Sequence, residues 1–287
     1  FYGTGDQNVA VGRQSQYGAS GTTTGSFNTS LGTQALYSNT TASYNTAVGY
    51  QAAYSQTTGG YNDAFGASAL YATTTGTSNT AIGRLSLTSN TTGAANVALG
   101  TQALQANTTA SNNTAVGYQA GYTGQTTTGA TYLGYQAGYY KNGTNDGIGS
   151  TFLGTVAGKN TTTGGDNTFV GAQAGYTNTT GTSNVALGAA ALNYNTTASN
   201  NTAVGYQAGY NITTSTGNTA LGYQSAYTLS SVGTGDYTTS VGYQALFYGT
   251  GDQNVAVGRQ SQYGASGTTT GSFNTSLGTQ ALYSNTT

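Results

Sequence analysis

The chain has 287 residues, of which only 11 are charged, and it contains no His, Cys, Pro, Met or Trp. Without His and Cys there is no imidazole base, thiolate nucleophile or soft metal ligand, and the six scattered Asp indicate no paired-carboxylate site. A net charge of −1 offers no electrostatic footprint for nucleic acid, and no apolar run approaches the ~20 residues that span a bilayer. We therefore expect no enzyme, no cofactor or metal site, no nucleic-acid partner and no membrane span in this segment.

The chain is built from repeats on two scales. Residues 1–41 recur without change at 247–287, so the long period is 246 residues. We expect a longer array, in which Phe1 is not the true start. Within the long period, a glycine recurs mostly every 17 residues and marks 14 short repeats, here called coils. The pattern predicts a single continuous array over 1–287.

Each coil reads approximately N-T-A-V-G-Y-Q-A-L-Y and then a polar segment, and its positions are numbered from the Asn. The β-branched T-A-V at positions two to four predicts a strand, as at 46–48, and the following Gly predicts a corner. Q-A-L-Y predicts a second short strand, and the T-T pair near positions 13 and 14 predicts a third strand or a turn. A coil of 17 residues is too short for a helix pair, so we expect an all-β parallel β-solenoid.

Three positions hold one type of residue in every coil. Position four is always large and apolar, and we expect it to point inward as the core ladder, which is Val11, Leu31, Val48, Phe65, Ile82, Leu99, Val116, Leu133, Leu153, Val170, Leu187, Val204, Leu221 and Val241. The corner glycines at position five are Gly12, Gly32, Gly49, Gly66, Gly83, Gly100, Gly117, Gly134, Gly154, Gly171, Gly188, Gly205, Gly222 and Gly242. Position eight is always Ala or Ser, which we expect opposite position four. Asn at one, Gln at seven and Tyr at ten are expected to stack on their own kind along the axis.

A single coil cannot stabilise itself. Burying one large aliphatic contributes about 1.5–3 kcal/mol, whereas ordering 17 residues costs on the order of 17–34 kcal/mol. Stacked backbone hydrogen bonds help, and burial between chains is an attractive supplement. We therefore expect self-association into a homo-oligomeric fibre, with Ala at position three and Leu or Gly at position nine as its contact surface. A single-chain solenoid is the alternative.

The motif N-T-A-V-G-Y-Q-A at 45–52, 113–120 and 201–208, with N-V-A-L-G-T-Q-A at 96–103, resembles the head repeats of YadA-like trimeric autotransporter adhesins. Similar repeats occur in phage tail fibres. The resemblance recurs in every coil and implies a left-handed β-roll, a homotrimer, surface display and adhesion to matrix or cells. The chain departs from that family in its longer coil, in its long duplication and in showing no stalk or anchor.

The tyrosines at position ten offer either a surface for sugars or a self-stacking ladder that stiffens the fibre, and they are Tyr37, Tyr54, Tyr71, Tyr122, Tyr139, Tyr176, Tyr210 and Tyr227. Sequons N-x-[ST] are abundant and offer glycan acceptors or arise from composition alone; among them are Asn39, Asn90, Asn107, Asn142, Asn160, Asn178, Asn195 and Asn211. An ice-binding Thr face is disfavoured because Val9, Asp63, Val97 and Val185 interrupt position two. The Asp residues keep no phase for repeated calcium sites.

These patterns favour a structural subunit of an extracellular fibre or surface filament, built from stacked coils and without catalysis. The alternative is a cell-surface adhesin or phage tail fibre that binds glycan or matrix through its lateral surface. A polysaccharide-acting enzyme on a β-helix would need clustered carboxylates or basic residues, which the sequence does not show.

Overall fold

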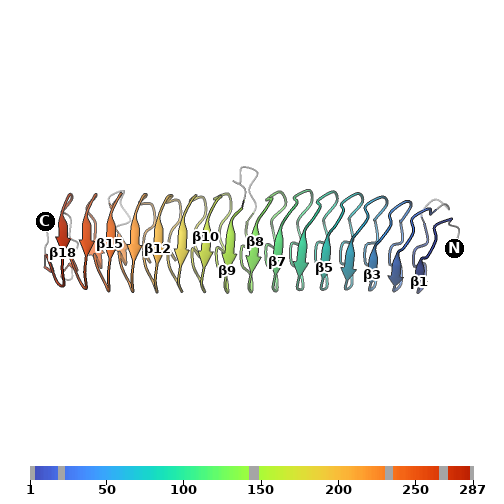
Figure 1. The fold of residues 1–287 in the computed structure, drawn as a ribbon, viewed down its shortest axis with the longest axis horizontal. Helices are drawn as coiled ribbons and strands as arrows, with labels where there is room; N and C mark the ends of the chain where they lie inside the picture. The colour runs from blue at the N-terminus through green and yellow to red at the C-terminus, as the bar shows by residue number, and fades with distance from the viewer. Residues whose placement is uncertain (1–3, 19–22, 142–148, 230–234, 265–270, 285–287) are drawn as a thin grey trace. The chain divides into compact units, whose positions relative to one another are not determined.

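The computed structural model describes residues 4–18, 23–141, 149–229, 235–264 and 271–284. The described residues contain no helix; their regular elements are short parallel strands, stacked as a β-solenoid with about 17 residues per coil (Figure 1). The all-β solenoid expected from the sequence is therefore confirmed. The chain divides into two compact units, Phe1–Thr144 (unit 1) and Asn145–Thr287 (unit 2), which are described separately. One continuous array over 1–287 stays a prediction.

Each coil contributes one three-residue strand to the sheet, at positions two to four. Unit 1 has β1 (Val9–Val11), β2 (Thr29–Leu31), β3 (Thr46–Val48), β4 (Asp63–Phe65), β5 (Thr80–Ile82), β6 (Val97–Leu99), β7 (Thr114–Val116) and β8 (Thr131–Leu133). Unit 2 has β9 (Thr151–Leu153), β10 (Thr168–Val170), β11 (Val185–Leu187), β12 (Thr202–Val204), β13 (Thr219–Leu221), β15 (Thr239–Val241), β17 (Val255–Val257) and β18 (Thr275–Leu277). A short parallel pair, β14 (Thr228–Leu229) with β16 (Tyr248–Gly249), is added in unit 2.

Neighbouring strands pair in register, so equal coil positions lie beside each other. In β3 and β4, Thr46 pairs with Asp63, Ala47 with Ala64, and Val48 with Phe65. Each identical position therefore forms a row along its unit, as was expected from the constant spacing.

The expected second strand at Q-A-L-Y is wrong. Positions seven and nine both adopt left-handed backbone conformations, as in Gln51 at φ 55° and Ala53 at φ 50°. Alternating left-handed residues cannot continue a strand, because an extended backbone needs negative φ throughout. The segment is a tight turn instead, and the T-T pair is not a strand either in the described coils.

The glycine at position five is required by both conformation and space. Gly49 has a φ of 136°, which L-residues rarely adopt. A Cβ on Gly49 would lie 2.7 Å from the carbonyl carbon and oxygen of Gly66 in the next coil. The corner therefore allows adjacent coils to approach closely.

The expected core ladder at position four is wrong, because those side chains face solvent. In a strand of three residues the faces alternate, so position three points inward and positions two and four point outward. Ala47 is buried and Phe65 is 39% exposed. The whole position-four set is therefore corrected from core to surface: Val11, Leu31, Phe65, Ile82, Leu99, Leu133, Leu153, Leu187 and Leu221 are exposed, and Val48, Val116, Val170, Val204 and Val241 are half-buried.

The core is formed by positions three, eight, nine and twelve. Position nine supplies the bulk in many coils, as in the fully buried Leu36, Leu87 and Leu192, with Ala or Ser at position three. Positions three and nine therefore cannot be the contact surface between chains, and that expectation is also wrong.

In three described coils with Gly at position nine, position three is a large aromatic residue. In unit 2, Phe152 and Phe169 are fully buried in coils whose ninth residues are Gly158 and Gly175. A Cβ on Gly158 would meet the Phe152 ring at 2.7 Å. Where a coil has a large side chain at one of these positions, the other is small. The coils of Gly121 and Gly209 have a large side chain at neither, and there Leu104 and Leu192 of the adjacent coils lie against the glycine.

Candidate functional site

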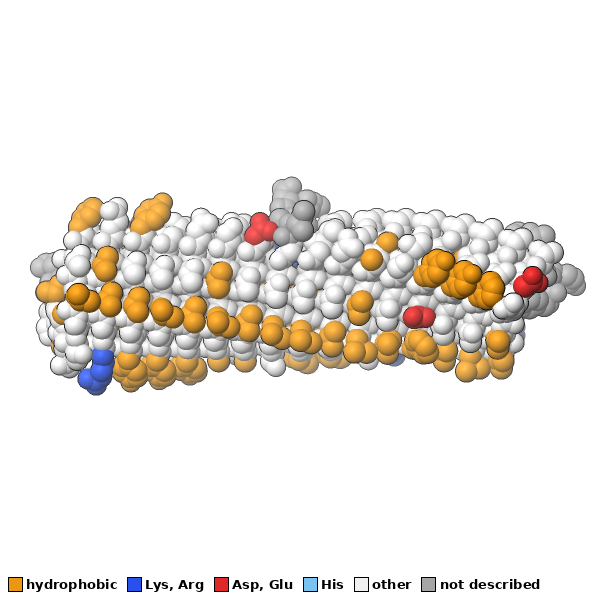
Figure 2. Space-filling model, viewed as in Figure 1, with side chains coloured by type: hydrophobic (Ala, Val, Ile, Leu, Met, Phe, Trp, Pro, Cys, Tyr) orange, Lys and Arg blue, Asp and Glu red, His pale blue; other side chains and the backbone are white. Residues whose placement is uncertain are grey.

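The most regular surface feature is the outward face of the sheet. The position-four row is apolar in every coil of both units, with exposed fractions such as 42% at Leu99 and 47% at Leu187. Figure 2 shows hydrophobic side chains recurring from coil to coil along this surface in each unit. Beside them, position two carries Thr in most coils, which gives the face an apolar row next to a mildly polar one.

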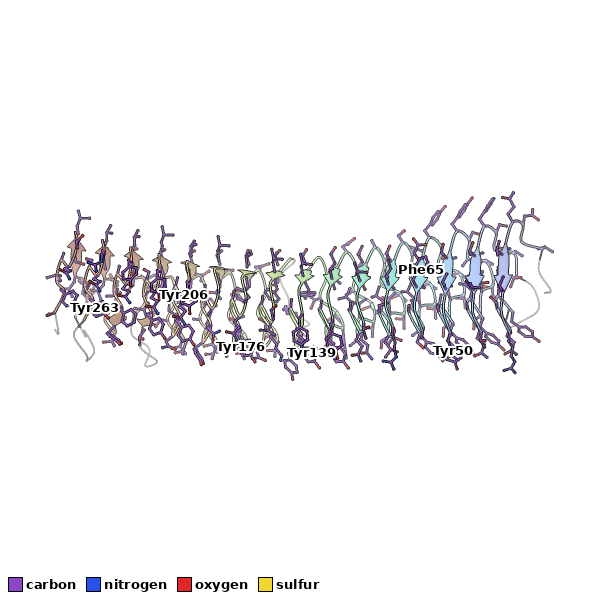
Figure 3. The ribbon with its side chains drawn as sticks, turned by 90° about the horizontal axis from the view of Figure 1, so that it is seen from below. Tyr50, Phe65, Tyr139, Tyr176, Tyr206 and Tyr263 are labelled. Atoms are coloured by element: carbon purple, nitrogen blue, oxygen red, sulfur yellow. The ribbon has the colours of Figure 1, made fainter. Side chains whose placement is uncertain are left out.

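A second set of exposed groups lies past the corner, at position six, which the sequence analysis did not single out. Exposed tyrosines there are Tyr50, Tyr118, Tyr135, Tyr206, Tyr223 and Tyr243. Figure 3 shows Tyr50 and Phe65 of unit 1 on different sides of the coils. Neighbouring members stack where they are adjacent, as Tyr223 does on Tyr243 at 5.1 Å between ring centroids.

The tyrosines at position ten form stacked ladders, as one of the two interpretations expected. In unit 1, Tyr37 and Tyr54 stack at 4.9 Å with an interplanar angle of 2°, and Tyr54 continues to Tyr71 at 5.1 Å. In unit 1 Tyr122 stacks on Tyr139, and in unit 2 Tyr210 stacks on Tyr227, which stacks on Phe247.

Stacking changes what these rings offer to a ligand. Inside a ladder, the faces that a sugar would need are covered by the rings of neighbouring coils, whereas an end ring such as Tyr71 has Thr88, and no aromatic residue, at position ten of the next coil. Tyr176 has no aromatic neighbour at position ten, because the two adjacent coils carry Lys159 and Asn193 there.

Burial affects the ionisation of several ladder tyrosines. Burial, followed by a hydrogen bond and electrostatic interaction with Tyr194, raises the pKa of Tyr210 to about 12. Burial also raises the pKa of Tyr139, Tyr227 and Tyr263, so these phenols stay neutral at physiological pH. Neutral phenols suit a stacking role and do not supply a general base.

Buried amides fix the coils against each other from inside. Asn45 at position one donates from Nδ2 to Oδ1 of Asn28 at 2.9 Å, and its own Oδ1 accepts the backbone N–H of Asn62 at 2.9 Å. The Gln row repeats the arrangement, with Gln51 Nε2 donating to Gln34 Oε1 at 3.0 Å. The expected Asn and Gln ladders are confirmed, and they leave these amides engaged within the fold.

Many sequons fall on buried positions, whereas Asn112 and Asn200, each followed by Asn and Thr, are exposed. Five acceptor residues at position twelve have no exposed surface, namely Asn39, Asn90, Asn107, Asn178 and Asn195. Asn39 instead binds its own turn, donating from Nδ2 to the carbonyl of Ala42 and accepting the N–H of the same residue. Asn160 and Asn211 are half-buried, and Asn142 lies outside the described residues. Those five residues are better explained as turn-forming amides than as glycan acceptors.

The described residues bring together no group of three His, Cys, Asp or Glu side chains that would hold a metal ion. Among the same residues, no helix has the length and apolarity needed to cross a membrane. The candidate site is therefore a surface: the outward sheet face with its position-four row. Comparison with protein-family models, curated proteins and solved structures found no match to the chain.

Proposed function

We propose that the chain is a structural subunit of an extracellular or cell-surface fibre, whose stacked coils associate with further copies through the position-four row. The supporting observation is that this row is apolar in every coil and yet faces solvent. Soluble monomers rarely expose contiguous apolar patches larger than a few hundred Å². The extracellular location rests on the resemblance of the repeat and is part of the proposal.

The row is long enough to matter energetically. Full burial of a large aliphatic side chain contributes about 1.5–3 kcal/mol, so covering the exposed half of one contributes roughly 1 kcal/mol. Each unit carries eight such side chains, and together they would supply on the order of 8 kcal/mol before the cost of association is subtracted. A shared interface along the coils is therefore within reach of stable binding.

A second copy of the chain is the partner that best fits the row. The side chains recur at one strand spacing, about 4.8 Å, and a partner must keep that spacing to stay in contact over many coils. Another solenoid with the same coil has it by construction. A homotrimer, which the resemblance implies, is one arrangement that would cover the row.

Direct glycan binding through the position-ten tyrosines is the weaker alternative, because the stacked rings cover one another's faces. An adhesive role would have to use other residues on the lateral surface. Nothing in the ladder geometry favours it over stiffening of the fibre.

The test compares two charged double variants of unit 2. Leu187→Lys with Leu221→Lys adds two charges to the row, and Thr197→Lys with Thr214→Lys adds two charges at exposed positions of the polar segment. Electron microscopy and analytical ultracentrifugation should show oligomers or filaments for the unmodified chain and the Thr variant. The Leu variant should stay monomeric with an unchanged circular dichroism spectrum. A chain that remains monomeric at high concentration, or a Leu variant that assembles normally, contradicts the proposal.

A further inference from the structure

The coil of unit 1 that contains β4 departs from the other coils on its outward side. Its outward residues are Tyr61 at position 17 of the preceding segment, Asp63 at position two and Phe65 at position four, and all three are exposed. Asp63 is the one charged residue within the strands that the structure describes. Its neighbours in β3 and β5 are Thr46 and Thr80. Folding of the coil does not require an acid here, since Thr serves the same position next door.

Tyr61 ends a short aromatic stack and presents an uncovered ring face. Phe27 stacks on Tyr44 at 4.8 Å, and Tyr44 stacks on Tyr61 at 5.0 Å, with interplanar angles of 4° and 5°. The next coil has Ser78 at the same position, so no ring covers the far face of Tyr61. The exposed fractions follow this order, rising from 43% at Phe27 through 48% to 63% at Tyr61.

Asp63 follows that ring by two residues, and its side chain is exposed as well. Tyr61 is exposed, Asn62 is buried and Asp63 is exposed, so the two outer side chains point to solvent on either side of an inward one. The backbone N–H of Asp63 donates to the carbonyl of Asn79 at 2.8 Å. Within the described residues no basic side chain pairs with the carboxylate.

The charge around the stack is negative at both ends. By sequence, Asp6 and Asp63 are the two acidic residues of unit 1. Asp6 lies against the other end of the stack, where its backbone carbonyl accepts the N–H of Phe27 at 3.0 Å. Figure 2 shows acidic side chains on either side of a run of large hydrophobic ones in unit 1. A ligand at this place meets an aromatic face and a negative potential together.

We propose that Tyr61 and Asp63 form a binding site for a guanidinium group, namely an arginine side chain of a partner protein. The planar guanidinium stacks on an aromatic face, whose centre is electronegative, while its N–H groups pair with a carboxylate through two hydrogen bonds. An ammonium group matches the charge but not the planar face, and a neutral sugar matches the face but not the charge. The exposed Ser78 leaves room for the planar group over the ring. This site does not depend on the association proposed for the position-four row.

The test uses N-acetyl-arginine amide as the probe and N-acetyl-citrulline amide as its uncharged counterpart of the same shape. Binding is followed by NMR shifts of the backbone amides from 61 to 80 in the full chain. Tyr61→Ser and Asp63→Thr introduce the residues that the next coil carries at these positions, Ser78 and Thr80, so both variants are expected to fold. Tyr237→Ser is the matched control, because Tyr237 is an exposed position-17 tyrosine followed two residues later by Thr239.

We expect saturable binding of the arginine probe that weakens as salt is added. Asp63→Thr should weaken it roughly tenfold or more, since a charge-assisted hydrogen bond is lost. Tyr61→Ser should also weaken it, whereas Tyr237→Ser should leave it unchanged. Equal binding of the citrulline probe, full binding by Asp63→Thr, or displacement of the arginine probe by a methyl hexopyranoside would overturn the proposal.

Discussion

Two glycines with positive φ allow the conformational and the steric role of the corner glycine to be measured separately. Gly32 is a corner glycine with φ of 138°, and Gly235 lies outside the corners with φ of 105°. They differ in what lies beside them. A Cβ on Gly32 would approach the Gly49 carbonyl oxygen at 2.5 Å and its carbonyl carbon at 2.7 Å, whereas a Cβ on Gly235 would have Leu229 Cβ and Ser215 Oγ at 3.5 Å, which is ordinary contact. Substitution by Ala therefore imposes conformational strain at both sites but overlap at only one.

The expected losses follow from these two terms. Holding Ala at a φ reserved for Gly costs on the order of 1–3 kcal/mol at either site. The overlap in Gly32→Ala must be relieved by moving backbone, and overpacking of this kind costs a further 1–3 kcal/mol or so. We therefore expect Gly32→Ala to lose about 2–6 kcal/mol of local stability and Gly235→Ala to lose about 1–3 kcal/mol.

Native-state hydrogen exchange is the appropriate assay, because a stacked array opens locally and a melting temperature would mix coils of different stability. The reporters are the N–H of Gly32, which donates to the carbonyl of Val11 at 2.8 Å, and the N–H of Gly235, which donates to Oδ1 of Asp252. In Gly32→Ala, protection should also fall at the N–H of Gly49, which donates to the carbonyl of Leu31. Equal losses at the two sites would show that stacking contacts do not explain the glycine, and the reasoning would fail.

Three further outcomes follow from the core and its ladders. Phe152→Ala should lower the free energy of unfolding by about 3–5 kcal/mol, measured with denaturant. Adding Gly158→Leu should recover much of that loss, because the double variant has the Ala-and-Leu arrangement of other coils. A double variant that loses the sum of the two single losses would contradict this. Asn184→Ala should cost about 1–3 kcal/mol, since the buried N–H of Asn201 loses its acceptor at 3.0 Å, and an unchanged unfolding midpoint would count against the ladder. Burial raises the pKa of Tyr210 to about 12, so the folded state favours the neutral phenol. The resulting contribution to the free energy of unfolding is complete below pH ~10, which is the pKa of the phenol in the unfolded chain. That contribution should be lost as pH rises through about 12, in a pH titration of stability; no difference from Tyr210→Phe across that range would refute the assignment.

Much of the fold follows from the repeat itself. The constant spacing fixes the coil, the T-A-V segment fixes the strand, and the Gly fixes the corner. The stacking of Asn, Gln and Tyr on their own kind follows from in-register coils. These features depend only on period and local conformation, which a single sequence shows directly.

The inward face could not be assigned from apolarity, because in a three-residue strand either the middle residue or its two neighbours can face inward. The informative signal is compensation in size. Phe152 and Phe169 at position three occur with Gly158 and Gly175 at position nine, as expected for two residues that share one interior. Position four shows no such compensation: Phe65 lies between Val48 and Ile82 with nothing reduced to make room. Tolerance of size without compensation is typical of a surface.

The surface interpretation raises the question of why position four stays apolar. Strand propensity alone does not require it, because Thr supports a strand as well as Val does, and position two uses Thr in most coils. Leu and Phe at position four offer no advantage in propensity over Thr. Solubility would favour a polar residue at an exposed site, so the apolar row points to a requirement outside the single chain. A partner with the same coil spacing satisfies that requirement at every coil, and its affinity should rise with the number of coils in contact. A partner of any other period would match a few coils and then lose register, so its affinity would not grow with the length of the array.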